Sequence, residues 1–458
     1  MNLPTAQLIP SKPPVLRHHT VDSSHSIIAS AGGYAATVSS IHSLSPPSRL
    51  RAPLAFKGPL TAVHPLARSN LLFLVAAKGN KVLLWDDVAE EVVLELAFRE
   101  KVLALQYRSD KLVVVLRRRI ILFDLDLQSG DNADLLTREG EYETVDNPLG
   151  LAAIATTHGS TLLAFPGRQA GHVQLVRLPA LGSRKAPSLP RTDISSAPPY
   201  QTIHIFLAHT SSLRTLVMSA TGSLLCTSSV KGTLLRVYDT HTRQLVRELR
   251  RGTDQADIWS VAFSNQENGG TVACSSDKGT IHVWHVGDLL SHFHATSIHS
   301  QAAEQHDYAH ESKEKSLKMF KPFLPAYFSS QWSDLTWRIP SSTGAGLLSR
   351  ETTSTEEDDV AICVFVPQDS DSVSSLANEQ HHLLVITRSG AWYRLSTSAS
   401  QALRGEHSES YNIGHDSIAK ASKARPTEDH KHCTMLEYRR FGPGNGENGV
   451  EDWSDDDD

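Results

Sequence analysis

TSSVKGT, at residues 227–233, recurs as CSSDKGT at residues 274–280. The offset between the two copies is 47 residues, close to the ~40–45 residues of a four-stranded propeller blade. A second pattern joins a Lys-Gly turn to an apolar run that ends in an aromatic residue and an aspartate, as in KGNKVLLWD at 78–86 and KGTLLRVYD at 231–239. Short β-rich runs separated by turns at this spacing predict a β-propeller.

The third strand of a blade can be recognised at six places in the chain. Besides the copies at 78–86, 231–239 and 274–284, it occurs as RIILFD at 119–124, GHVQLV at 171–176 and SGAWYR at 389–394. Because exposed strand edges pair with other chains, a propeller has to close its ring. The N-terminal region, with its apolar patch at 26–38, is a candidate seventh blade that has lost the pattern. The alternative is a six-bladed ring with a disordered N-terminal tail.

We therefore predict an all-β fold, a seven-bladed WD40-like propeller whose first blade is degenerate or incomplete. Residues 1–57 are the poorly readable N-terminal region, residues 58–442 carry the blades, and a long insertion occupies residues 286–333. Residues 443–458 form an acidic tail that we expect to be disordered. Segments rich in Pro, Ser or Thr at 179–199 and 341–359, and a polar segment at 397–430, are predicted to be loops.

The overall composition excludes several classes of protein. The formal net charge is -6, so no global basic field draws the molecule to nucleic acid, and any anion binding has to be local. No run of about 18 apolar residues can span a bilayer, and the N-terminus lacks the pattern of a secretory signal. The four cysteines are far apart without a CxxC pair, which argues against a zinc site or a disulfide framework and favours a reducing, cytosolic setting.

Two adjacent arginines stand out in the stretch Leu249-Arg250-Arg251-Gly252. Successive side chains of an extended strand point to opposite sides, so the two guanidinium groups are placed to serve two sites rather than one. A guanidinium offers a planar fork of donors that matches phosphate or carboxylate oxygens. The pair therefore indicates two anion sites, and the alternative is a pair of structural ion pairs with Asp254 or Asp257.

The repeated SSxKGT segments flank these arginines in the sequence, one upstream and one downstream. Each supplies hydroxyls, a lysine and a glycine turn, which together make a good donor set for phosphate oxygens. The alternative is that the Ser and Thr residues are only the turn residues of repeated hairpins. No GxSxG elbow, phosphate loop or HExxH motif occurs, so we predict neither enzymatic activity nor a cofactor.

The insertion at 286–333 begins with many histidines and continues with lysines interleaved with aromatic residues. Basic residues mixed with aromatics are typical of a loop that enters a membrane interface. The alternative is that the aromatics pack on the blade while the lysines are solvated. The spacing of the histidines matches no zinc template, so we predict no metal site.

Several stretches resemble a known family, the PROPPINs, which are seven-bladed propellers that bind polyphosphoinositides and carry the signature Phe- or Leu-Arg-Arg-Gly. The resemblance is strongest to the fungal autophagy-18-like, Hsv-type branch, with Leu249 at the position where Phe or Leu is allowed. It rests on LLRVYDTHTRQLVRELRRGTDQADIWSVAFS at 234–264, CSSDKGTIHVW at 274–284, KVLLWDD at 81–87, FLPAYFSSQWS at 323–333 and CTMLEYRRFG at 433–442.

The resemblance implies two headgroup sites for phosphatidylinositol 3-phosphate and 3,5-bisphosphate, and a membrane-inserting loop. By this resemblance, site 1 consists of His209, Ser228, Lys231, Thr233 and Arg250. Site 2 consists of Arg251, Ser275, Ser276, Thr280 and His282. The inserting loop contains Lys318, Phe320, Phe323, Tyr327 and Phe328.

The same resemblance implies a cytoplasmic protein that acts peripherally on preautophagosomal, endosomal and vacuolar membranes. Its partners would be membranes that contain phosphoinositides and an autophagy protein, a large lipid-transfer protein, with no nucleic acid partner. The alternative from a different class is a WD40-type scaffold that binds only proteins.

Overall fold

The structure is a computed structural model of the chain, and it describes the strands of the fold and most of the turns between them. The described residues are 18–21, 27–32, 35–40, 60–66, 69–76, 78–127, 135–181, 200–264, 270–286, 330–340, 360–367, 381–388, 391–397 and 432–440. Within these ranges the regular structure is entirely β-strand. The all-β prediction is therefore confirmed.

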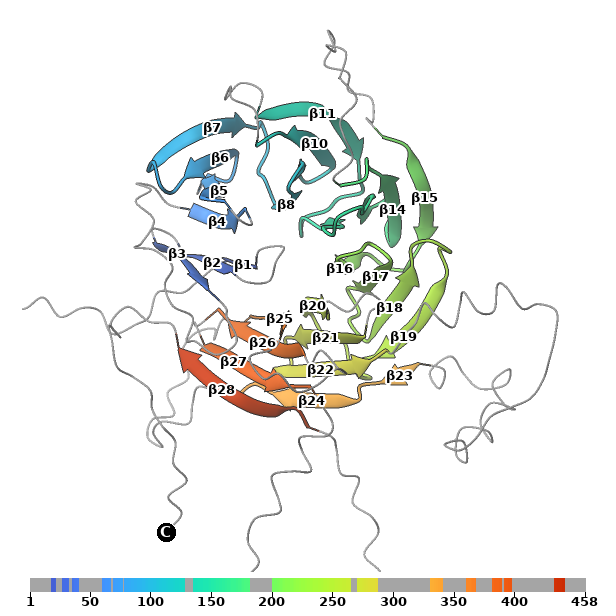
Figure 1. The fold of residues 1–458 in the computed structure, drawn as a ribbon. Coiled ribbons are helices and arrows are strands. Elements are labelled where there is room, and N and C mark those ends of the chain that lie inside the picture. Colours follow the sequence, from blue (N-terminus) through green and yellow to red (C-terminus); the bar gives the residue numbers. More distant parts are fainter. Residues whose placement is uncertain are drawn as a thin grey trace, which may run out of the picture.

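The described strands assemble into seven sheets, which Figure 1 shows arranged around a ring. The first sheet has three strands: β1 (His18–Val21), β2 (Ile27–Gly32) and β3 (Ala35–Ser40). The next three have four strands each: β4 (Leu60–Pro65), β5 (Leu71–Ala76), β6 (Lys81–Asp86) and β7 (Glu91–Ala97); β8 (Ala104–Arg108), β9 (Lys111–Val115), β10 (Arg119–Leu125) and β11 (Leu136–Glu143); β12 (Ala153–Ile154), β13 (Leu162–Pro166), β14 (His172–Arg177) and β15 (Thr202–Leu207).

The remaining three sheets lie toward the C-terminus. The fifth contains β16 (Leu213–Met218), β17 (Leu224–Ser229), β18 (Leu234–Asp239), β19 (Leu245–Arg250) and the short β23 (Gln331–Trp332). The sixth contains β20 (Ile258–Phe263), β21 (Thr271–Ser276), β22 (Thr280–His285) and β24 (Leu335–Arg338). The seventh contains β25 (Ala361–Pro367), β26 (His381–Thr387), β27 (Ala391–Ser396) and β28 (Thr434–Arg440).

The six third strands predicted from the repeats are confirmed. The patterns at 78–86, 119–124, 171–176, 231–239, 274–284 and 389–394 fall on β6, β10, β14, β18, β22 and β27, and each of these is the third strand of its sheet along the chain. The insertion at 286–333 connects β22 to β24, and the polar segment at 397–430 lies between β27 and β28. Both sites of insertion are therefore connections between the third and fourth strands of a sheet.

The N-terminal region contains strands that the sequence did not reveal. Strands β2 and β3 fall on the apolar patch at 26–38, and β1 and β2 both pack against β4. Figure 1 shows this three-stranded sheet between β4 and the sheet of β25 to β28. A first blade at this place agrees with the predicted degenerate blade, while the closure of the ring and the number of blades stay predictions. The same holds for the domain boundaries near residues 57 and 442.

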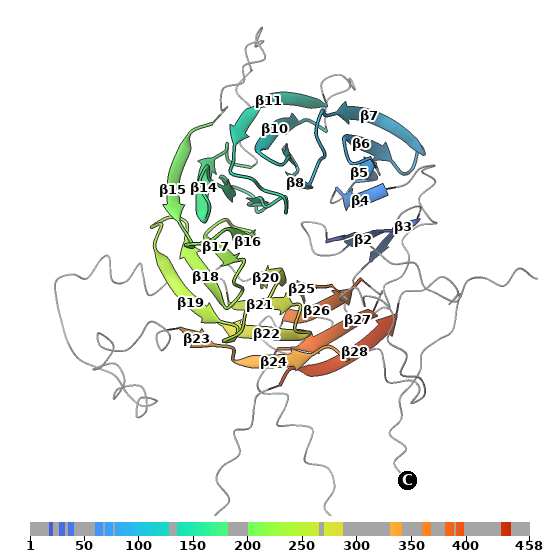
Figure 2. The same cartoon turned by 180° about the vertical axis from the view of Figure 1, so that it is seen from behind.

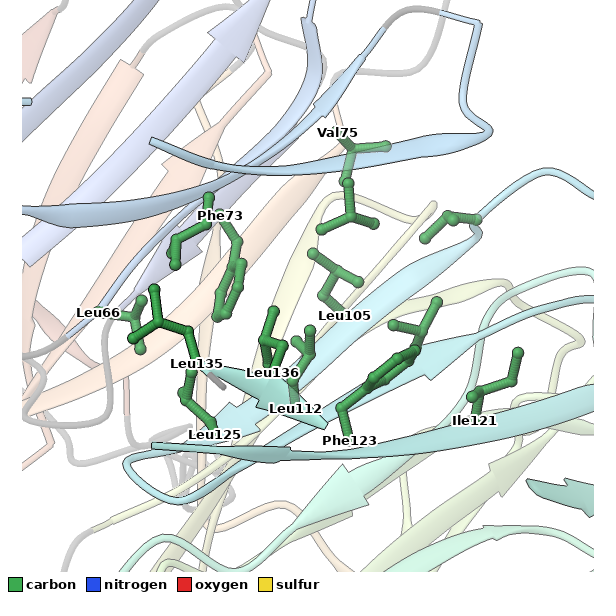
Figure 3. Packing of buried hydrophobic residues seen from close by; sticks show 14 of the residues in the cluster. Leu66, Phe73, Val75, Leu105, Leu112, Ile121, Phe123, Leu125, Leu135 and Leu136 are labelled. Atoms are coloured by element: carbon green, nitrogen blue, oxygen red, sulfur yellow. The ribbon is translucent and has the colours of Figure 1, made fainter. Parts of the chain in front are cut away.

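Neighbouring sheets pack face to face through apolar clusters. Figure 3 shows the cluster between the sheets of β4–β7 and β8–β11, where Phe73, Leu112 and Phe123 pack together. A comparable cluster joins the fifth and sixth sheets, with Leu249 of β19 and Trp284 of β22 both fully buried. Because this second cluster holds β19 against the sixth sheet, it determines the position of Arg250, which ends β19, and of Arg251, which follows it.

Candidate anion-binding site

Leu249 anchors the arginine pair. Its side chain is buried in the cluster between the fifth and sixth sheets, and burying a leucine contributes about 2 kcal/mol. In the sheet it pairs with Leu235 of β18, and the next residue, Arg250, pairs with Leu234. Since neighbouring side chains on a strand point to opposite faces, the buried Leu249 turns Arg250 away from this cluster.

Arg250 contacts the segment that returns from the insertion. Strand β23 runs parallel to the end of β19, with Gln331 opposite Leu249 and Trp332 opposite Arg250. Arg250 Nε donates a hydrogen bond of 2.7 Å to Ser330 Oγ, and the guanidinium carbon lies 5.8 Å from the centroid of the Trp332 ring. Arg250 is only 7% exposed, so most of this side chain is held inside the protein.

Arg251 has different neighbours. Its Nε donates to the carbonyl of Gly232 at 2.8 Å, and Nη2 donates to the backbone carbonyl of Asp254. Its backbone N–H donates to the carbonyl of Thr233 at 3.0 Å. The Asp257 carboxylate pairs with Arg214 at 3.5 Å. Among the residues that the structure describes, no carboxylate forms an ion pair with Arg251, so the ion-pair alternative does not describe this arginine.

The described hydrogen-bond partners of the Arg251 side chain are therefore neutral backbone carbonyls. The side chain is 7% exposed, and a buried charge is costly unless an opposite charge or several hydrogen bonds compensate it. Two backbone carbonyls accept hydrogen bonds from the guanidinium, but being neutral they do not compensate its positive charge. The geometry thus produces a positive potential at the junction between the fifth and sixth sheets, which an anion would stabilise.

The residues predicted for site 1 surround the turn between β17 and β18. The Ser228 hydroxyl is buried and lies 2.8 Å from Thr215 Oγ1. Lys231 is exposed and Thr233 is half-buried. In this turn the carbonyls of Gly232 and Thr233 accept hydrogen bonds from Arg251. The pairing of Leu234 with Arg250 brings the end of the turn beside the other arginine.

His209 belongs to the same region but is buried. Its Nε2 lies 3.0 Å from Thr227 Oγ1. Burial, reinforced by the positive charge of Arg236, lowers the pKa of His209 to about 4. The imidazole is therefore neutral near pH 7, and it can take part in anion binding there as a hydrogen-bonding group rather than as a cation.

The residues predicted for site 2 lie on β21 and β22. The Ser275 hydroxyl donates a hydrogen bond of 2.6 Å to the carbonyl of Ala361 in the seventh sheet. The neighbouring Ser276 Oγ is buried without a hydrogen-bond partner among the described residues. Thr280 begins β22, is half-buried, and pairs with Arg338 of β24.

His282 completes this second group. Its Nδ1 is 3.2 Å from Ser333 Oγ. Burial and then the charge of Arg251 lower the pKa of His282 to about 4. The hydrogen bonds of the Arg251 side chain itself go to Gly232 and Asp254. The membership of both sites stays a prediction.

Three residues near these sites were missed by the assignment of sites from sequence. Ser330 and Trp332 contact Arg250, and Ser333 contacts His282. All three belong to the FLPAYFSSQWS stretch that supported the family resemblance, which was the available signal. The predicted loop residues Lys318, Phe320, Phe323, Tyr327 and Phe328 lie outside the described residues.

No helix in the described ranges has the length and apolar character to cross a bilayer. No group of three or more His, Cys, Asp or Glu side chains in those ranges is arranged to hold a metal ion.

Comparison with known proteins gives the family. The WD domain, G-beta repeat matches residues 243–285. The SVP1-like protein 2 of Emericella nidulans is 34% identical over 274 residues, which cover 58% of this chain and 74% of that protein. The chain belongs to the PROPPIN family. This confirms the resemblance on which the site assignment rests.

Other PROPPIN relatives match over about half of their own length. The SVP1-like protein 2 of Neurospora crassa is 36% identical, with 52% of this chain and 49% of that protein covered. The Autophagy-related protein 18e of Arabidopsis thaliana is 32% identical, with 48% of this chain and 50% of that protein covered.

Solved structures show the same fold. Hsv2 of Kluyveromyces lactis with its complete loop 6CD has a TM-score of 0.58 at 17% identity, covering 94% of this chain and 99% of that chain. The complex of KlAtg21 with the coiled-coil of AgAtg16 has a TM-score of 0.56 at 13% identity, covering 93% of this chain and 99% of that chain. These likenesses support the WD40-type propeller fold.

Proposed function

We propose that this PROPPIN recognises phosphoinositides at two headgroup sites, one organised around Arg250 and one around Arg251. The observation that carries the proposal is the buried arginine pair, in which Arg251 is held by backbone carbonyls and no described carboxylate neutralises it. Phosphate oxygens complement such a guanidinium in both charge and geometry. The ligands proposed from the family are phosphatidylinositol 3-phosphate and 3,5-bisphosphate.

Two weak sites on one membrane-bound molecule act together. Once one headgroup is bound, the second binding event becomes intramolecular, and the combined affinity can exceed that of either site by a factor of about 10² or more. We place the protein peripherally on preautophagosomal, endosomal and vacuolar membranes, where it acts in autophagy and vacuolar or endosomal trafficking. The name of the Arabidopsis relative as an autophagy-related protein supports this placement.

A protein partner also forms part of the proposal. KlAtg21, which shares the fold, is found in a complex with a coiled-coil of AgAtg16, and this favours a propeller that recruits autophagy proteins to the membrane. The large lipid-transfer protein expected from the family is proposed as one such partner. The role is that of a non-enzymatic adaptor.

Cosedimentation with liposomes tests the headgroup sites. Replacement of both arginines, Arg250→Thr with Arg251→Thr, is expected to abolish binding to liposomes that contain either phosphoinositide. The matched control is Arg117→Thr with Arg118→Thr, because it removes the same charge from two adjacent, exposed arginines that pair with Asp146. The control protein should still sediment. Unchanged sedimentation of the first variant would refute the lipid mechanism.

Ionic strength separates this function from the protein-only scaffold. Attraction between phosphates and cations weakens as salt screens the charges, so liposome binding should fall steeply between low and high salt. A scaffold whose arginines only stabilise the fold would show no lipid-dependent sedimentation at any salt concentration.

A further inference from the structure

The segment Ser330–Asp334 contacts residues of both proposed sites, although it follows Arg250 by about eighty residues in the sequence. Its short strand β23 adds to the edge of the fifth sheet in parallel with β19, and β24 of the sixth sheet follows directly. Both views of the ring show β23 beside β19 and next to β24, at the outer edge of the two sheets (Figures 1 and 2). The segment therefore spans the junction between the sheets that carry the two arginines.

At its first end the segment holds Arg250. The Ser330 hydroxyl is buried and accepts the 2.7 Å hydrogen bond from Arg250 Nε. The Trp332 ring, 48% exposed, lies within cation-π distance of the same guanidinium. The bond to Nε helps to fix the plane of the guanidinium. An arginine held in this way loses less conformational freedom when it binds an anion.

At its second end the segment holds His282. Ser333 Oγ lies 3.2 Å from His282 Nδ1, and the charge of Arg251 acts on the same imidazole. A hydrogen bond to Nδ1 orients the imidazole ring and leaves Nε2 facing the opposite direction. The Ser333 hydroxyl is thus placed to orient a side chain of site 2.

Asp334 fixes this end to the sixth sheet. Its backbone N–H donates a hydrogen bond of 2.9 Å to the carbonyl of Val283, and its Oδ2 accepts one of 2.6 Å from the backbone N–H of His285. Gln331 Nε2 donates to the same carboxylate at 3.3 Å. With pairing to β19 at one end and these bonds at the other, a displacement of one end of the short segment is transmitted to the other.

We propose that Ser330 and Ser333 are positioning residues of the two headgroup sites, and that the Ser330–Asp334 segment couples the sites energetically. Ser330 orients Arg250, Ser333 orients His282, and the backbone between them links the two. The inference rests on the proposed function, since it assumes that both arginines bind phosphate groups. It adds a physical connection by which occupation of one site changes the affinity of the other.

Calorimetric titration of the full chain with soluble inositol 1,3-bisphosphate tests the positioning role. Ser330→Ala is expected to weaken about fivefold the site that Arg250→Thr removes, because a net hydrogen bond is lost, and to leave the other site unchanged. Ser333→Ala should weaken the site that Arg251→Thr removes to a similar extent. A purely structural role would instead lower the melting temperature and affect both sites alike.

Two variants of the same segment serve as controls. Ser330→Thr keeps the hydroxyl and should restore the affinity. Gln331→Ala removes a side chain whose hydrogen bond, among the described residues, goes to Asp334, so both sites should keep their wild-type affinities. If Ser330→Ala fails to fold, Ser330→Cys is used, because it is nearly isosteric and a weak acceptor.

The coupling has its own measurement. In the wild-type background, Arg250→Thr should change the affinity of the remaining site by about twofold or more, and this change should disappear when Ser330→Ala and Ser333→Ala are combined. Wild-type affinities in both serine variants would overturn the inference. Absence of any binding by the wild-type chain would instead overturn the proposed function, and the inference with it.

Discussion

The two SSxKGT repeats have nearly the same sequence but different surroundings. In the repeat at 227–233, the Ser228 hydroxyl pairs with Thr215 inside its own sheet, and no described carboxylate lies within ion-pair distance of Lys231. In the repeat at 274–280, the Ser275 hydroxyl reaches across to Ala361 in the next sheet. There Lys278 also pairs with Asp277 at 3.2 Å.

The difference shows that the repeat specifies the turn, while the neighbouring sheets decide what its side chains do. The first repeat keeps an exposed lysine available beside the arginine pair. In the second repeat the Ser275 hydroxyl is hydrogen-bonded to Ala361 of the next sheet, and the Ser276 hydroxyl is buried without a described partner. Two headgroup sites built on these repeats should therefore differ in strength and in ligand contacts.

The glycines of the two turns provide the largest expected contrast. A Cβ on Gly232, at φ +59°, would lie 1.7 Å from the carbonyl oxygen of Ala256, whereas a Cβ on Gly279, at φ +66°, would meet nothing within 4 Å. Gly232→Ala should cost roughly 3 kcal/mol or more in unfolding free energy, from backbone strain and overpacking. Gly279→Ala should cost only about 1 kcal/mol. Urea unfolding measures both, and equal losses would contradict the contrast.

Single arginine variants separate the two sites. Arg250→Thr and Arg251→Thr should each remove one headgroup site and lower its affinity about tenfold to a hundredfold, since a charged hydrogen-bonded group is lost. Titration with inositol 1,3-bisphosphate should then report one site in place of two. If either single variant eliminated both sites, the assignment of one arginine to each site would be wrong.

Acid should destabilise the fold through His209, which is buried, and His282, which is half-buried. The pKa of His209 is lowered to about 4 by burial, so between pH 6.5 and 4 the unfolded chain binds a proton that the folded chain does not, and stability falls as pH decreases. At pH 5 the contribution of His209 is about 1–2 kcal/mol. His209→Gln should flatten the pH dependence of the melting temperature over this window.

His282 extends this comparison to the second site. Its pKa is also lowered to about 4, so His282→Gln should flatten the pH dependence of stability to a similar extent. A phosphate bound beside His282 would raise its pKa, so the headgroup affinity of site 2 should increase as pH falls from 7 toward 5. A pH-independent affinity would show that His282 does not gain a proton when the headgroup binds.

Ser276 gives the smallest expected change in stability. Its buried hydroxyl has no described partner, so Ser276→Ala should leave the unfolding free energy within about 0.5 kcal/mol of wild type. Ser275→Ala is the matched comparison, because it leaves the Ala361 carbonyl without this donor and should cost about 1 kcal/mol. A loss of headgroup affinity in Ser276→Ala without a loss of stability would identify it as a ligand-binding residue.

Much of the architecture was predictable because a blade repeats its own local pattern. Most of the predicted third strands carry a turn, an apolar run and an aromatic or aspartate residue, and these features depend on near neighbours in the chain. Strands β1 to β3 lack that pattern, so only the structure shows that these segments are strands and that they lie beside β4.

The sequence by itself determined the class of fold, the repeating strands and the presence of an arginine pair between two donor-rich turns, because each depends on residues close together in the chain. Only the tertiary structure decided which groups hold those arginines. Arg250 lies against Ser330 and Trp332 through a parallel pairing of distant segments, and Arg251 lies against the carbonyls of Gly232 and Asp254. Such contacts depend on how sheets pack, and packing brings together residues whose separation in sequence carries no local signal.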